Sequence, residues 1–172
     1  MTESTERRPW WQYALVTVPV IVLLGSASGW LSQSGYGNAW FDALAKPPFM
    51  PPGWVFGAAW TVLYALMGLA VAMILAAPQS DHRRKGLTAF VAQLAVNYAW
   101  SPIFFAAHDI RLAFYAILIM LALAAAATAQ FIKVRPLAGV LLVPYLAWLC
   151  FAAALTNAVD RLNPGAGSSL LG

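Results

Sequence analysis

The residues of this chain that could do chemistry are amide and aromatic side chains set in apolar surroundings. In the run 86–107 they recur at intervals of four, three and four residues, as Gln93, Asn97, Trp100 and Phe104. This spacing places them on one side of a helix. Amide side chains in a bilayer should face protein, a cavity or a ligand. This helix face is therefore a candidate binding surface.

Two further helix faces carry large aromatic side chains. The first holds Trp60, Tyr64 and Met67, and the second holds Tyr145, Trp148, Ala152 and Leu155. If the three faces converge, Trp60, Trp100 and Trp148 wall a pocket, with Asn97 and Tyr64 as its polar groups. Aromatic walls with few polar groups suit a large, flat, mostly apolar molecule. The alternative is a packed aromatic core whose amides bond within the protein.

The long apolar runs of the chain, in which these residues lie, exclude most catalytic chemistry. They contain no Asp, Glu, His, Lys or Arg, so general bases, metal clusters and proton relays are missing at membrane depth. His82 and His108 fall in different loops on opposite faces, and the single cysteine, Cys150, lies in an apolar run. We therefore predict no catalytic residues, no metal ligands and no intrinsic cofactor.

Composition identifies the elements that carry these faces. Of 172 residues, 62% are hydrophobic and 9% are charged, whereas soluble domains are about a quarter charged. Five charge-free runs each exceed the 18 or so residues that a membrane-spanning helix needs. They are 11–31, 54–77, 86–107, 112–132 and 136–159. The chain is therefore predicted to be an all-α integral membrane protein, a five-transmembrane-helix bundle over residues 11–163.

The loop 32–53 is predicted to be a lid over the pocket. Pro47, Pro48, Pro51 and Pro52 disfavour helix, so the end of the loop should be a stiff, ordered crossing. Trp40 and Trp54 lie at the two ends of this aromatic stretch, and we expect them to contact the ligand. Anchoring at the membrane interface is the alternative role for these tryptophans.

The basic residues are distributed unevenly between the two faces. Seven Lys and Arg residues fall on the side of the N-terminus and three on the side of the lid loop. This asymmetry predicts a cytoplasmic N-terminus if the host is a bacterial inner membrane. The extension 1–10 would then be cytoplasmic, and the Gly/Ser-rich tail 164–172 is predicted to be disordered. No basic stripe marks a nucleic-acid partner.

Three blocks of the sequence resemble the tryptophan-rich sensory proteins, also called translocator proteins or peripheral-type benzodiazepine receptors (TspO/MBR). They are WFDALAKPPFMPPGWVF from Trp40 with WTVLY from Trp60, QLAVNYAWSPIFF from Gln93, and PYLAWLCFA from Pro144. The resemblance implies a five-helix membrane protein, usually dimeric, that binds porphyrins such as protoporphyrin IX and haem, and also sterols. It implies sensing in tetrapyrrole-linked or stress responses. Trp60, Trp100 and Trp148 would line the cavity, with Asn97 and Ala152 beside them.

Departures from the family pattern bear on the ligand. Phe49 stands where Trp is frequent, and Thr156 stands where Asn is usual after Leu155. Asn157 takes the place of the Tyr in a sterol-associated pattern, which makes sterol binding doubtful. Two functions besides sensory binding stay open: a light-dependent porphyrin-degrading enzyme and a porphyrin transporter.

The third predicted span carries small residues opposite Gln93 and Asn97. They are Thr88, Ala92, Ala95, Ala99, Pro102 and Ala106. Small residues allow close approach of helices in lipid. This face is therefore predicted to form a homodimer. The GxxxG pair Gly25 and Gly29 in the first span is interpreted as packing inside one bundle.

Overall fold

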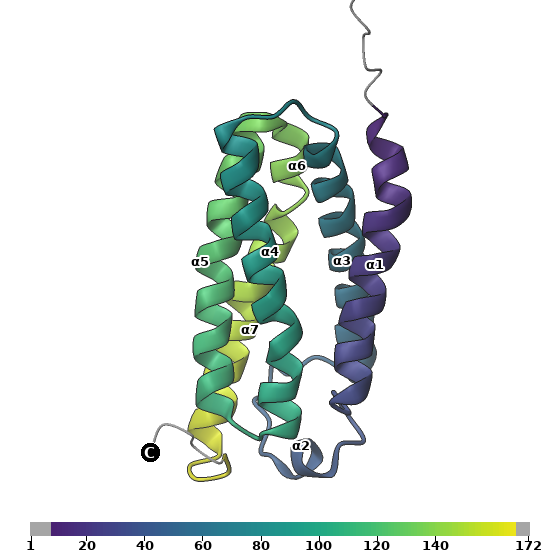
Figure 1. The fold of residues 1–172 in the computed structure, drawn as a ribbon. Helices are drawn as coiled ribbons and strands as arrows, with labels where there is room; N and C mark the ends of the chain where they lie inside the picture. Colours follow the sequence, from purple (N-terminus) through teal and green to yellow (C-terminus); the bar gives the residue numbers. More distant parts are fainter. Residues whose placement is uncertain (1–7, 168–172) are drawn as a thin grey trace, which may run out of the picture.

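The computed structural model describes residues 8–167 and is an all-helical bundle (Figure 1). The main helices are α1 (Trp10–Leu31), α3 (Gly53–Leu75), α4 (Asp81–Ser101), α5 (Ile110–Val134) and α7 (Val143–Leu162). Short elements accompany them: α2 (Ala39–Ala43), the π-helical turn η1 (Pro102–Ala106) and α6 (Pro136–Val140). Five helical segments of the described chain are long and apolar enough to span a membrane, which confirms the predicted fold class.

The observed boundaries differ from the predicted ones where local side chains set them. The span predicted at 86–107 begins at Asp81, because the Ser80 hydroxyl accepts a hydrogen bond from the Arg83 N–H at 3.1 Å. Its last turn is the π-helical turn, which starts at Pro102. The runs predicted at 11–31, 54–77 and 112–132 correspond to α1, α3 and α5, with ends that differ by at most two residues.

The span predicted at 136–159 is broken in two. Two turn residues, Leu141 and Leu142, separate α6 from α7, and Pro144 lies in the first turn of α7, where proline is tolerated. α7 then continues to Leu162, and Asp160 and Arg161 are part of it. Hydropathy alone could not find this break because the whole stretch Pro136–Leu162 is apolar enough to count as one span.

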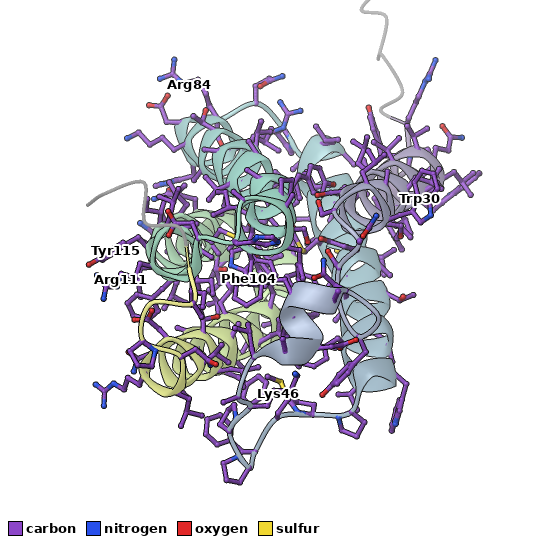
Figure 2. The ribbon with its side chains drawn as sticks, turned by 90° about the horizontal axis from the view of Figure 1, so that it is seen from below. Trp30, Lys46, Arg84, Phe104, Arg111 and Tyr115 are labelled. Carbon is purple, nitrogen blue, oxygen red and sulfur yellow. The ribbon has the colours of Figure 1, made fainter. Side chains whose placement is uncertain are left out.

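The five spans form a ring in the order α1, α3, α7, α5 and α4 (Figures 1 and 2). α1 and α3 cross closely at Gly68, where a Cβ atom would lie only 2.8 Å from Cγ2 of Val18. The Thr17 hydroxyl donates a hydrogen bond to the Gly68 carbonyl at 2.7 Å. Of the neighbouring pairs in the ring, α3 and α7 approach each other least along their backbones.

The lid segment, residues 32–53, closes one end of the bundle and contains the unpredicted helix α2. The Asn38 side chain caps α2 by accepting a hydrogen bond from the Phe41 N–H at 3.1 Å. The Lys46 ammonium group donates to the carbonyls of Phe41, Asp42 and Leu44 at 2.8–3.1 Å. α2 is only five residues long, which is too short for a helical period of apolar residues to be recognised in the sequence.

The end of α7 holds the lid segment in place. The Asn163 side chain accepts from the Ala45 N–H at 2.8 Å and donates to the Ala45 carbonyl at 2.9 Å. The Trp40 indole N–H donates to the Ala166 carbonyl at 3.1 Å. Residues 164–167, the described part of the predicted tail, form a turn after α7. Residues 168–172 of that prediction lie outside the described chain.

Candidate ligand-binding site

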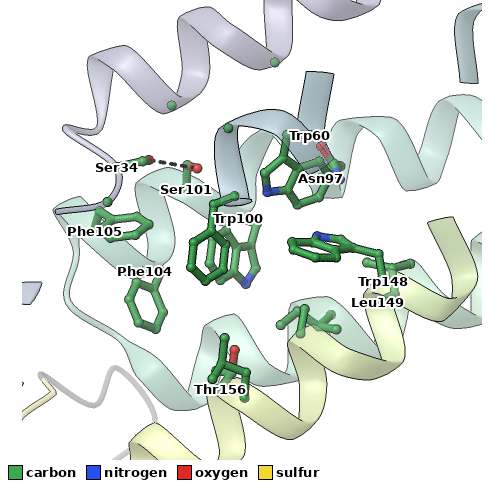
Figure 3. Close-up of a pocket in the computed structure, with 18 of the residues that line it drawn as sticks. Ser34, Trp60, Asn97, Trp100, Ser101, Phe104, Phe105, Trp148, Leu149 and Thr156 are labelled. Carbon is green, nitrogen blue, oxygen red and sulfur yellow. Dashed lines mark hydrogen bonds between the residues drawn. The ribbon is translucent and has the colours of Figure 1, made fainter. Parts of the chain in front are cut away.

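A cavity of about 520 Å³ lies inside the ring of helices, against the lid segment (Figure 3). Residues of α1, α3, α4, η1, α5 and α7 line it, together with Tyr36, Phe41 and Met50 of the lid segment. Its volume falls in the range of small-molecule sites, about 300–1,000 Å³. No lining residue is charged at neutral pH.

Seven of the nine predicted site residues line this cavity. They are Trp60, Tyr64, Asn97, Trp100, Phe104, Trp148 and Ala152. The three helix faces singled out in the sequence therefore converge, and Figure 3 shows the Trp60, Trp100 and Trp148 rings around one space. This convergence places the residues together; it does not by itself identify a ligand.

Two of the tryptophans meet at the wall between α3 and α7. The ring centroids of Trp60 and Trp148 lie 6.3 Å apart in an edge-to-face arrangement, at 82°. Trp60 also stacks on Tyr64, with 5.1 Å between centroids. Such contacts stabilise a pair by about 0.5–1.5 kcal/mol beyond burial. The aromatic wall is therefore held in one arrangement while its ring surfaces still border the cavity.

A hydrogen-bonded network fixes the polar part of the wall. The Tyr64 hydroxyl donates to Oδ1 of Asn97 at 2.7 Å, and Nδ2 of Asn97 donates to the Tyr145 hydroxyl at 3.0 Å. The Tyr145 hydroxyl donates in turn to Oε1 of Gln93 at 2.8 Å. Gln93 and Tyr145 are 1% exposed and lie behind the cavity wall. Both amides are thus satisfied within the protein, as the alternative interpretation of the sequence required, yet Asn97 still borders the cavity.

Trp100 contributes a ring surface rather than a hydrogen bond. Its indole N–H donates to the Ala113 carbonyl at 3.2 Å, and its ring stacks on Phe104 with 5.2 Å between centroids and 17° between planes. The position of Phe104 depends on the π-helical turn in which it lies. Viewed from the lid end, Phe104 lies near the centre of the bundle, whereas Trp30 and Tyr115 point outward (Figure 2).

The other two predicted site residues, Trp40 and Trp54, lie outside the cavity wall. Trp54 is 74% exposed on the outer face of α3. Trp40 packs beneath the cavity, stacked on His108 with 4.4 Å between centroids and edge-to-face on Phe104. Trp40 belongs to the loop predicted at 32–53, where no helical period predicts side-chain direction. Trp54 starts the predicted span 54–77, but it precedes Trp60 by six residues and therefore lies on a different side of α3 from the cavity face.

Several lining residues were not predicted as site residues. They include Gly25, Ser26, Gly29, Ser34, Tyr36, Phe56, Thr61, Leu149, Phe151 and Thr156. Gly25 leaves room for the Tyr64 ring, because a Cβ atom there would lie 2.8 Å from the Tyr64 hydroxyl oxygen and closer to its ring. The GxxxG pattern was the signal for this contact, and its first glycine does pack inside the bundle. Ser34 Oγ and Ser101 Oγ lie 3.1 Å apart near the lid.

This arrangement is suited to binding. The lining offers aromatic faces, hydroxyl groups and one amide, with no acid, base or cation. The described residues also contain no cluster of three or more His, Cys, Asp or Glu side chains that could hold a metal ion. A flat apolar molecule could stack on the rings, and the Asn97 amide or nearby hydroxyls could orient it.

Fold and site together define a five-helix integral membrane protein with an internal, uncharged, aromatic cavity. The chain belongs to the TspO/MBR family, whose sequence profile matches residues 15–162. It is 42% identical over 126 residues to the tryptophan-rich sensory protein of Cereibacter sphaeroides, covering 73% of this chain and 78% of that relative. It is 38% identical over 144 residues to the human translocator protein, covering 83% and 85%. Protein CrtK of Rhodobacter capsulatus is 38% identical over 129 residues, covering 74% and 81%.

Proposed function

We propose that this protein binds porphyrins and related tetrapyrroles, such as protoporphyrin IX or haem, as a membrane sensor of tetrapyrrole-linked or stress conditions. The observation that carries the proposal is the neutral cavity with Trp60 and Trp148 on one side and Trp100 on another. A porphyrin presents two large ring faces, and these fit aromatic walls better than they fit aliphatic ones.

The chemistry of the lining favours particular probes. It contains no His or Cys to bind a haem iron and no cation to pair with porphyrin carboxylates. We therefore expect the ring to be bound through its faces, with the carboxylates kept near water at the lid end. Metal-free protoporphyrin IX is the simplest ligand for a test. Sterols are not proposed as ligands.

Titration of protoporphyrin IX into the protein in lipid nanodiscs tests this function. Saturable quenching of tryptophan emission is expected, because a ring in the cavity lies against the indoles. Trp60→Ala and Trp148→Ala should weaken binding, since each removes a stacking surface and enlarges the cavity. Trp10→Ala and Trp11→Ala, at the exposed start of α1, are the matched controls. Equal losses in the controls and the cavity variants, or no saturation, would contradict the proposal.

Light-dependent porphyrin degradation is the second candidate function. It is favoured by the contact of two indoles, Trp60 and Trp148, with the Tyr64 ring stacked on one of them. Such a cluster at the cavity wall could supply electrons to an excited ligand without an ionisable partner. Illumination of the complex, followed by absorbance, separates this function from binding alone. No feature of the structure specifically favours transport.

We also propose that the N-terminus is cytoplasmic if the protein lies in a bacterial inner membrane. Basic residues at the start of α4 and the end of α5 are Arg83, Arg84, Lys85, Lys133 and Arg135. These helix ends lie at the end of the bundle where α1 begins (Figure 1). Three others lie in elements at the opposite end: Lys46 in the lid segment, Arg111 at the start of α5 and Arg161 at the end of α7. Basic residues favour the cytoplasmic side. A fluorescent protein fused to the N-terminus should fold and fluoresce, whereas periplasmic alkaline phosphatase activity of an N-terminal fusion would reverse the assignment.

A further inference from the structure

A second hollow lies on the outside of the bundle, along the seam between α3 and α7. Only apolar residues line it: Trp54, Val55, Ala58, Ala59, Val62 and Leu63 from α3, and Pro144, Ala147, Trp148 and Phe151 from α7. It is shallow and wide open to the outside of the bundle. We call it the outer groove. Lying on the outer surface of two membrane-spanning helices, it would be open to lipid chains.

The outer groove and the internal cavity share two residues, Trp148 and Phe151, both half-buried. A single layer of side chains therefore separates the cavity from the outside of the bundle at this seam. The neighbouring groove residues Ala58 and Ala147 are small, so they add little to the barrier. The groove thus lies directly against the proposed ligand site, with these rings between the two.

This layer consists of rings in contact rather than of packed backbone. Trp148 meets Phe56 edge-to-face with 6.0 Å between centroids, and it meets Phe151 at 5.5 Å. α7 packs mainly on α5, and its backbone barely approaches α3. Opening the seam therefore needs changes in side-chain rotamers, while the helices can keep their places.

The lid end of the cavity offers more resistance. Two hydrogen bonds between Asn163 and Ala45 and one from Trp40 to Ala166 join the lid segment to the end of the chain after α7, while Lys46 bonds carbonyls within the segment. Moving the lid segment away from α7 would require the bonds to Asn163 and Ala166 to break. The lid end also faces water, where a large apolar ring is poorly soluble.

We infer that the α3–α7 seam is a side entrance from the bilayer into the cavity, with Trp148 and Phe151 as its gate. Its occupant is a flat, mostly apolar ring molecule dissolved in the membrane, which rests in the outer groove before the gate rings turn. The inference depends on the proposed ligand class but assigns a route that ligand binding alone does not require.

Filling the outer groove tests the entrance without touching the cavity. Ala147→Phe and, from the opposite wall, Ala58→Phe add rings at residues that line the groove and not the cavity. Ala126→Phe, at an exposed alanine of α5 outside both hollows, is the matched control. Association and dissociation rates would be measured by stopped flow in nanodiscs, using protoporphyrin IX and the neutral polycyclic hydrocarbon perylene as probes.

We expect each groove variant to slow association and dissociation by the same factor, five-fold or more, with an unchanged dissociation constant and no change in the control. Rates equal to wild type in both groove variants would overturn the entrance and leave the ligand site intact. A loss of affinity without matched slowing would also overturn it, because the groove would then be part of the site. Binding of perylene but not protoporphyrin IX would reject only the porphyrin assignment. Binding of neither probe would overturn both proposals.

Discussion

Asn97 shows how one residue can serve both the core and the cavity. Its amide bonds two tyrosine hydroxyls from different helices, Tyr64 of α3 and Tyr145 of α7. These bonds link α3 to α7 through α4. The link matters because the backbones of α3 and α7 scarcely approach each other. An apolar residue at position 97 would leave the Tyr64 hydroxyl without this partner, at about 1–3 kcal/mol, whereas the Tyr145 hydroxyl would keep its bond to Gln93. Asn97 therefore links two helices while one edge of its side chain borders the cavity.

Gly25→Ala should destabilise the protein, whereas Gly29→Ala should not. A Cβ atom at position 25 would lie 2.8 Å from the Tyr64 hydroxyl oxygen and closer to the ring, but at position 29 its nearest neighbour is Ser34 Oγ at 3.8 Å. Both substitutions replace glycine with alanine and therefore gain the same helix propensity. The difference between the stabilities of the two variants thus measures the clash at position 25. We expect about 1–3 kcal/mol of lost stability for Gly25→Ala. Thermal unfolding in detergent would show a lower midpoint for this variant alone; equal midpoints would contradict the contact.

Trp148→Phe should separate binding from photochemistry. Phe keeps a ring surface at this wall, so we expect affinity for protoporphyrin IX to fall by a few-fold at most, about 1 kcal/mol. If the indole donates electrons to the excited porphyrin, the same variant should lose the light-dependent decay of porphyrin absorbance. Decay at the wild-type rate in Trp148→Phe, and also in Trp60→Phe, would exclude indole-driven degradation through these two residues.

At the scale of elements, the sequence predicted what depends on periodicity and missed what depends on packing. Regular spacing identified the cavity faces of α3, α4 and α7, because a continuous helix fixes side-chain direction. The contribution of α1 was missed, since glycine and serine at 25, 26 and 29 carry no hydrophobic or aromatic signal. The break before α7 and the short helix α2 were missed because each rests on a few residues and on tertiary contacts.

The lid segment should loosen when its tie to α7 is removed. Asn163→Ala deletes both hydrogen bonds to Ala45 and one to the Val159 carbonyl. Each of the two bonds to Ala45 stabilises the closed lid segment by about 1 kcal/mol. Without them, we expect the backbone amides of residues 38–46 to exchange with solvent roughly tenfold faster or more. Asn157→Ala, within α7, is the control. Unchanged exchange in Asn163→Ala would mean that Lys46 and Trp40 suffice to hold the lid segment.

For the whole molecule, the ring arrangement separates the inner and outer faces of α4. Asn97, Trp100 and Phe104 point into the cavity, while the small residues Ala95, Ala99 and Pro102 are exposed on the opposite side. The alternative dimer face at Gly25 and Gly29 is less available, because Gly25 packs against Tyr64 within its own bundle. We therefore propose that two copies of the chain associate through α4.

Ala95→Leu combined with Ala99→Leu should shift the detergent-solubilised protein toward monomer. Larger side chains keep two helices apart in a lipid-like environment, where close van der Waals packing is the main source of association. Ala122→Leu with Ala126→Leu, at two exposed alanines of α5 with the same spacing, should leave the mass unchanged. Light scattering of the protein–detergent complex measures the outcome. The α4 variant should keep its porphyrin affinity, because the substituted side chains face away from the cavity. An unchanged mass would reject this interface, and a parallel loss of affinity would show that the leucines disturb the bundle itself.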